Sequence, residues 1–194
     1  MSYLIQVPSV MHIGAGASRQ LGSVIANFKC SNPLLITDPI MVSLGYVETI
    51  IAQLKEVGID CDYCDETEPE PTIASLQPSL KMLASGNYDC LVALGGGSPI
   101  DSAKALSVLH VYGGKMSDYK VPRSVDQLGL PVIAIPTTAG TGSEATRFTV
   151  ITDDTSDEKM LCAGAAFLPS AALIDYELTL TLPPRTTADT AIDA

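Results

Sequence analysis

The sequence predicts an α/β protein built on a doubly wound, mostly parallel sheet with an added β-hairpin. Two observations predict this fold class. Short apolar runs without polar alternation recur along the chain, separated by segments of helical length, as is typical of strands buried on both faces. Loops rich in glycine or threonine follow two of these runs, at 95–97 and 136–144. In parallel sheets, such loops form ligand sites at the carboxyl ends of strands.

Each element has a local signal in the sequence. The run from Cys90 to Leu94 is continuously apolar and ends at three glycines, and Gly58 ends a segment with helical apolar spacing. Strands are expected at 34–37, 59–64, 90–94, 131–135 and 171–174, with a weaker strand around His12. Helices are expected at 17–28, 40–57, 72–85 and 99–112. A hairpin formed by 148–152 and 159–163 is expected to turn at Asp153-Asp154.

The pattern near the end of the chain indicates a domain boundary. Pro183-Pro184 interrupts the chain, and a helix is expected to begin near Thr186 or Thr187. We therefore expect residues 1–184 to form a dinucleotide-binding α/β domain. Residues 185–194 are expected to begin a second, helical domain that this sequence does not contain.

Composition and charge exclude several classes of partner. The formal net charge of −11 disfavours nucleic acid and anionic lipid, so we expect neither as a partner. The first residues lack the basic start and long apolar run of a signal peptide or membrane span. Five cysteines, an odd number, indicate a reduced and therefore cytoplasmic protein. Because lysines and arginines are scattered, any bound phosphate is expected to contact backbone N–H groups.

The stretch Gly95 to Lys104, GGGSPIDSAK, predicts a phosphate site. It lies between a predicted strand and a predicted helix, where glycines allow close approach of a diphosphate. Ser98 is expected to cap the helix, with Pro99 in its first position and Asp101 completing a capping box. The alternative is a tight structural turn. No Gly-Lys-Ser/Thr follows, so the loop is not of the Walker type.

Two further features near the amino terminus concern nucleotide binding. Gly14-Ala15-Gly16 resembles the start of a dinucleotide fingerprint, but Arg19 stands at the third glycine position, so a simple turn is expected. Asp38 ends the second strand, where an acid can accept hydrogen bonds from the adenosine ribose and repel a 2′-phosphate. That role favours NAD over NADP. The alternative for Asp38 is an Asp-Pro turn signal.

The loop Pro136 to Glu144, PTTAGTGSE, follows another buried strand. Its small hydroxyl side chains can donate to a phosphate or a carboxamide. The alternative is an ordinary polar loop. Two such loops at two strand ends predict one shared crevice.

These motifs together resemble the iron-containing (group III) alcohol dehydrogenase family. GGGSPIDSAKA followed by PTTAGTGSEAT carries the resemblance, and MHIGAGA, LITDP and ALIDYELTLTLPPRTTADTAIDA add to it. The resemblance implies a Rossmann-like nucleotide domain, a carboxyl-terminal all-helical domain absent from this chain, and a cleft between them for metal and substrate. It also implies a homo-oligomer, expected to be a dimer.

The resemblance also implies roles for individual residues. Gly96, Gly97 and Ser98 would hold the diphosphate, Asp38 would lie near the adenosine ribose, and Asp101 near the nicotinamide. Thr137, Thr138, Thr141, Lys159 and Leu178 would contact the cofactor. Asp193 would be the first metal ligand, on Fe²⁺ or Zn²⁺. Three histidine ligands would follow it, and the only histidines present are His12 and His110.

One departure from the family pattern falls in the expected cofactor cleft. The sequence reads Glu68-Pro69-Glu70-Pro71, where the family often has asparagine at the third position. An acid there puts the cofactor contact of Glu70 in doubt.

The expected activity is hydride transfer between NAD and a primary alcohol or aldehyde, with these 194 residues inactive alone. The alternatives are a glycerol-dehydrogenase-like or dehydroquinate-synthase-like metal enzyme, or a non-catalytic nucleotide-binding module. Since substrate contacts in the family come mostly from the other half, the sequence does not name the alcohol.

Overall fold

A computed structural model describes residues 5–193, and of Asp193 it describes the backbone only. Six parallel strands form one sheet in the order β1-β8-β5-β4-β2-β3, and two antiparallel strands form a separate hairpin. The strands are β1 (Val10–Ile13), β2 (Pro33–Ile36), β3 (Asp62–Cys64), β4 (Cys90–Gly95), β5 (Val132–Pro136), β6 (Phe148–Asp153), β7 (Glu158–Ala163) and β8 (Ala171–Ile174). The predicted fold class is confirmed.

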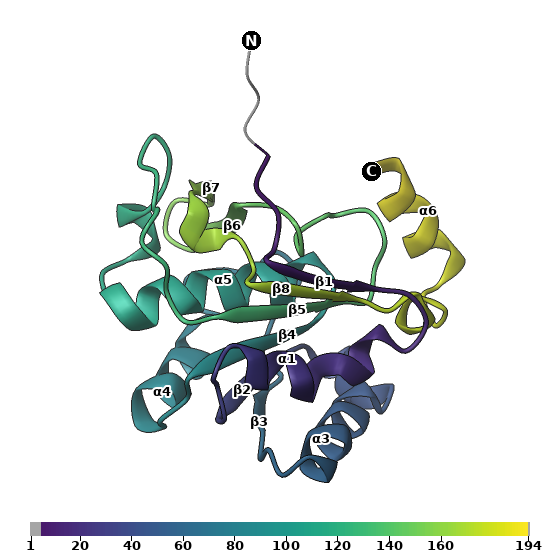
Figure 1. Cartoon of the computed structure of the whole chain (residues 1–194). Coiled ribbons are helices and arrows are strands. Elements are labelled where there is room, and N and C mark those ends of the chain that lie inside the picture. The colour runs from purple at the N-terminus through teal and green to yellow at the C-terminus, as the bar shows by residue number, and fades with distance from the viewer. Residues whose placement is uncertain (1–4, 194) are drawn as a thin grey trace.

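Helices cover both faces of the sheet (Figure 1). The α-helices of the described chain are α1 (Leu21–Asn27), α2 (Pro39–Ser43), α3 (Tyr46–Glu56), α4 (Gln77–Ser85), α5 (Gly97–Tyr112) and α6 (Pro184–Asp193). One apolar core joins the sheet to α4, α5 and the hairpin, through residues such as Leu83, Leu106 and Ile151. A second core joins the other face to α1 and α3, through residues such as Val24 and Ile50.

The sheet changes winding direction between β2 and β4, which are neighbours in the sheet. The connection after β2, through α2 and α3, packs on one face, whereas the connection after β4, through α5, packs on the other. A crevice for ligands is expected where two such connections diverge, at the carboxyl ends of the strands. Asp38 follows β2 at this point, and Gly95 ends β4.

Several predicted elements have different boundaries in the structure. The strand expected at 59–64 is Asp62–Cys64, and the helix expected to begin near Thr186 or Thr187 begins at Pro184. The helix expected at 40–57 is two helices, because Gly45 adopts a left-handed φ of 75° that an α-helix does not accommodate. The helix expected at 72–85 begins at Gln77, since Thr72 instead forms a β-bridge to Thr152 of the hairpin. The helix expected from Pro99 begins at Gly97.

In the described part of the chain, none of the helices combines the length and the apolar character needed to cross a membrane.

Candidate nucleotide site

The amino terminus of α5 carries no side-chain cap. Its N-cap residue is Gly96, no side chain accepts a hydrogen bond there, and the first turn contains no acid. The expected cap by Ser98, completed by Asp101, is therefore wrong. The backbone already becomes helical at Gly97, which places Ser98 inside the first turn. The unused N–H groups and the partial positive charge of this 16-residue helix remain available to an anion.

Gly95 is required by its conformation and its neighbours. Its φ is 143°, and a Cβ atom there would lie 2.7 Å from Cγ of Pro99 and 3.2 Å from Oδ2 of Asp38. The same distances show that the carboxylate of Asp38 lies beside the glycine loop. Asp38 also caps α2, because its Oδ1 accepts hydrogen bonds from the N–H groups of Ile40 and Met41. The turn role of Asp38 is thus present, and its Oδ2 lies beside Gly95.

The threonine loop packs directly on the glycine loop. Cβ atoms built on Gly96 and Gly97 would each lie 3.3 Å from a methyl group, that of Thr138 and that of Thr141 respectively. These contacts are tighter than ordinary van der Waals distance, so both glycines allow the two loops to touch. The two loops predicted to share a crevice therefore lie together, and Gly96 and Gly97 also serve the contact between them.

Two threonine hydroxyls beside the glycine loop have no partner. Within residues 5–193, Oγ1 of Thr137 and Oγ1 of Thr138 are buried and form no hydrogen bond. The backbone N–H of Thr137 donates to the carbonyl of Gly95 at 2.9 Å, which fixes this segment against the end of β4. Buried hydroxyls are normally hydrogen-bonded, so an unpaired pair at a strand end calls for a ligand or water.

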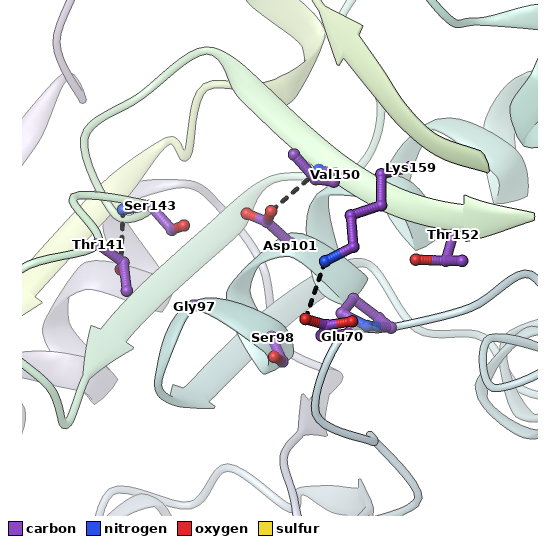
Figure 2. Close-up of a pocket in the computed structure, with 10 residues that line it drawn as sticks. Glu70, Gly97, Ser98, Asp101, Thr141, Ser143, Val150, Thr152 and Lys159 are labelled. Carbon is purple, nitrogen blue, oxygen red and sulfur yellow. Dashed lines mark hydrogen bonds and ion pairs between the residues drawn. The ribbon is translucent and has the colours of Figure 1, made fainter. Parts of the chain in front are cut away.

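A cavity of about 380 Å³ opens beside the first turn of α5 (Figure 2). It is lined by Glu70, Pro71, Gly97, Ser98, Asp101, Thr141, Ser143, Val150, Thr152 and Lys159. Its walls come from the glycine loop, the threonine loop, the hairpin and the segment before α4. Five predicted cofactor residues therefore line one cavity: Gly97, Ser98, Asp101, Thr141 and Lys159.

Asp101 and Lys104 attach the hairpin to α5. Oδ2 of Asp101 accepts a hydrogen bond from the N–H of Val150 at 3.0 Å. Nζ of Lys104 donates to the carbonyl of Phe148 at 2.7 Å and lies 3.5 Å from Oδ1 of Asp101. The Lys104 side chain is fully buried, and this burial lowers the pKa of its ammonium group, an effect that the nearby Asp101 opposes. These contacts hold the hairpin wall of the cavity in place.

Lys159 and Glu70 both line the cavity, and their side chains contact each other (Figure 2). Nζ of Lys159 donates to Oε1 of Glu70 at 2.8 Å. The carboxylate of Glu70 therefore points to Lys159 and lines the cavity.

The glycine pair near the amino terminus holds an internal carboxylate. Oδ1 of Asp175 accepts from the N–H of Gly16 at 3.0 Å, and Oδ2 accepts from the N–H and the hydroxyl of Ser18 at 3.2 and 2.7 Å. Burial alone would raise the pKa of Asp175, but these hydrogen bonds lower it. The loop therefore uses its N–H groups within the protein, in agreement with the expected turn.

Other predicted residues lie outside the cavity. Thr137, Thr138 and Gly96 lie on the same loops but do not line it, and Leu178 lies in a short 3₁₀-helix packed on the core under α1 and α3. Sequence reasoning missed Pro71, Ser143, Val150 and Thr152 as lining residues. Only the alternation along the predicted hairpin strand hinted that the latter two share a face.

The described residues do not assemble the expected metal site. Asp193 is the last residue of α6, and its side chain lies outside the described part of the structure. Within that part, the group with ligand spacing is Cys30, Asp89 and Cys90, at the amino-terminal ends of β2 and β4. Those ends are opposite to the glycine loop. Asp89 already accepts hydrogen bonds from the N–H groups of Ser31 and Asn32, so this group is unrelated to the expected site.

Comparisons with known proteins agree with this architecture. The long-chain-alcohol dehydrogenase 1 of Geobacillus thermodenitrificans is 35% identical over 193 residues, covering 98% of this chain and 48% of that protein. A 1,3-propanediol oxidoreductase structure matches with a TM-score of 0.95 and 29% identity, over 100% of this chain and 50% of that one. A sulfoacetaldehyde reductase from Bifidobacterium kashiwanohense, solved in complex with NAD⁺, matches with a TM-score of 0.92 and 28% identity, over 100% and 51%.

The chain spans about half the length of the curated relatives that it matches. The family model for iron-containing alcohol dehydrogenase matches residues 8–176, which is most of the sequence. The chain therefore belongs to the iron-containing alcohol dehydrogenase family.

Proposed function

We propose that this chain binds NAD at the glycine loop and forms the cofactor-binding half of an NAD-dependent, metal-containing alcohol dehydrogenase. The observation that carries the proposal is the pair of buried, unpartnered hydroxyls of Thr137 and Thr138 beside the uncapped amino terminus of α5. Free N–H groups and hydroxyls at a helix start are the donors that a diphosphate needs. The start of α5 follows β4, beside the point where the sheet changes winding direction, and this place supports the same conclusion.

Each loop contributes to a different part of the cofactor in this proposal. The N–H groups of Gly96, Gly97 and Ser98 bind the diphosphate, and Asp38 accepts from the adenosine ribose. Thr137, Thr138, Thr141, Lys159 and Leu178 line the path of the dinucleotide. Asp101 lies near the nicotinamide, and the hydrogen bond from the N–H of Val150 on the hairpin fixes its carboxylate.

The reaction proposed for the whole protein is hydride transfer between the carbinol carbon of a primary alcohol and the nicotinamide ring. The residues of this chain bind and orient the cofactor and exclude water from its diphosphate. Fe²⁺ or Zn²⁺ would polarise the substrate oxygen when bound. Asp193 is the one metal ligand proposed from this chain.

The wider organisation is also a proposal. Residues 1–184 are proposed as the dinucleotide-binding domain and 185–194 as the start of a helical domain that binds the metal. We propose a cytoplasmic homodimer acting on a small alcohol or aldehyde. Relatives of this chain are named as alcohol dehydrogenases, which supports the proposed substrate class. The chain matches only about half of their length, which supports a second domain.

Replacing each buried threonine hydroxyl by a methyl group tests the proposal. Thr137→Val and Thr138→Val each remove an unpaired buried hydroxyl, which by itself is expected to leave stability unchanged or raise it by up to about 1 kcal/mol. If the hydroxyls serve NAD, calorimetry will show NADH affinity falling about 10- to 150-fold, as the loss of a hydrogen bond to a charged group predicts. Unchanged NADH affinity in both variants, or no NADH binding by the unmodified chain, would refute the proposal.

A further inference from the structure

The ion pair between Glu70 and Lys159 lines the cavity and joins two distant parts of the chain. Glu70 lies between β3 and α4, Lys159 lies on β7, and they are 89 positions apart. Their side chains are 70% and 59% exposed, so both charged groups are reachable from solvent. The ammonium group of Lys159 points to Glu70, and Asp101 and Ser98 line the same cavity (Figure 2).

The backbone around Glu70 holds its side chain in this position. Glu70 has a φ of 55°, in the left-handed region that is disfavoured for a glutamate. On its carboxyl-terminal side the segment is fixed to the hairpin, because the N–H of Thr152 donates to the carbonyl of Pro71 at 2.8 Å. The N–H of Ile73 donates to the carbonyl of Thr152 at 3.0 Å. A conformation that local energetics disfavour is thus retained at the position facing Lys159.

The ion pair also sets the charge of the cavity. Asp101, whose side chain is largely buried, is balanced by the buried Lys104. Among the lining residues, Lys159 is the one cation, and its charge is balanced by Glu70. An anionic ligand that needs the Lys159 ammonium must therefore replace the carboxylate of Glu70 or share the ammonium with it.

We propose that Glu70 competes with the anionic cofactor for Lys159 and so lowers cofactor affinity. The inference rests on the proposed function, since it takes the dinucleotide as the ligand of this cavity. Beyond that function, Glu70 acts through Lys159, and removing the carboxylate of Glu70 makes cofactor binding tighter rather than weaker.

A double-mutant cycle tests this coupling. The variants are Glu70→Gln, Lys159→Gln and the double variant in the 194-residue chain, with NADH affinity measured by calorimetry. Because the pair is exposed, Glu70→Gln is expected to tighten NADH binding by only about two- to fivefold. Lys159→Gln is expected to weaken it, and Glu70→Gln is expected to have no effect once Lys159 is gone. The gain should shrink as salt is raised.

Glu158→Gln is the matched control. Glu158 precedes Lys159 on the same strand and pairs with Lys120 at 2.9 Å, but it does not line the cavity. This variant makes the same charge change and is expected to leave NADH affinity unchanged. Urea unfolding of every variant shows whether the fold is retained.

Two results would overturn the inference while leaving the proposed function standing. One is an equal effect of Glu70→Gln and Glu158→Gln, which would indicate a general charge effect. The other is undiminished tightening by Glu70→Gln without Lys159, which would indicate direct repulsion of the cofactor. Failure of the unmodified chain to bind NADH would instead refute the proposed function itself, and the inference with it.

Discussion

Asp175 provides a quantitative test of how the loop after β1 is joined to the end of β8, its neighbour in the sheet. Its buried carboxylate accepts four hydrogen bonds, from the N–H groups of Gly16, Ser18 and Glu177 and from the hydroxyl of Ser18. Asp175→Asn keeps one oxygen, which can still serve Gly16 and Glu177. The new amide group instead opposes the N–H of Ser18, donor against donor.

The structure gives a magnitude for this change. Leaving the buried N–H of Ser18 unpaired costs about 1–3 kcal/mol, and the two retained hydrogen bonds weaken because their acceptor loses its charge. We expect the free energy of unfolding to fall by about 2–4 kcal/mol at pH 7. For a chain of this size the melting temperature should fall by about 5–12 °C.

The effect should depend on pH in a defined direction. The pKa of folded Asp175 is lowered below its ordinary value, because its hydrogen bonds outweigh the opposing effect of burial. The stabilisation is therefore fully present above the unfolded pKa of about 3.9 and is lost as pH falls through the lower folded pKa. The difference between wild type and Asp175→Asn should shrink below about pH 4.

Urea unfolding at several pH values measures both quantities. The control is Asp60→Asn at an exposed position, which should change stability by less than about 0.5 kcal/mol. A loss below about 1 kcal/mol for Asp175→Asn at pH 7, or a loss that does not diminish in acid, would refute the reasoning.

Three further changes test the site and its supports. Lys104→Met leaves the carbonyl of Phe148 and the largely buried Asp101 without their cation. The free energy of unfolding in urea is expected to fall by about 3 kcal/mol. An unchanged free energy of unfolding would contradict the role of Lys104 in attaching the hairpin to α5. Asp38→Asn retains an acceptor for the α2 cap but removes the charge, so the proposed preference for NADH over NADPH should narrow by roughly tenfold in calorimetry. An unchanged ratio would remove the ribose role. Gly95→Ala should destabilise the fold by about 2 kcal/mol or more, because φ is 143° and Pro99 is in the way; a smaller loss would contradict the loop geometry.

The sheet could be predicted because its strands are buried on both faces and read as continuous apolar runs. The run at 90–94 is completely buried, and the glycines that end it mark the loop correctly. Helix boundaries were less predictable where glycine changes the backbone. Gly45 divides a helix whose apolar spacing continues across it, and Gly97 starts α5 before the residue that has the better capping chemistry.

Contacts between distant segments could not be predicted from the sequence. The carboxylate that fills the turn at Gly16 comes from Asp175, 159 positions away. Lys104 and Asp101 are three residues apart and share a helix face, but the burial of Lys104 depends on the hairpin that covers it. The resemblance to the family predicted Lys159 as a cofactor contact, whereas its ion pair with Glu70 is seen only in the structure.

Titration of the ¹⁵N-labelled 194-residue chain with NADH, followed by backbone amide chemical shifts, tests the central claim most directly. If the diphosphate binds at the start of α5, the largest shifts will occur at the N–H groups of Gly96, Gly97 and Ser98, with smaller changes at Thr137 and Thr138. Gly16 and Ser18, whose N–H groups already bind Asp175, should change little. Saturable shifts centred on Gly16 and Ser18, or none at Gly96 to Ser98, would contradict the account.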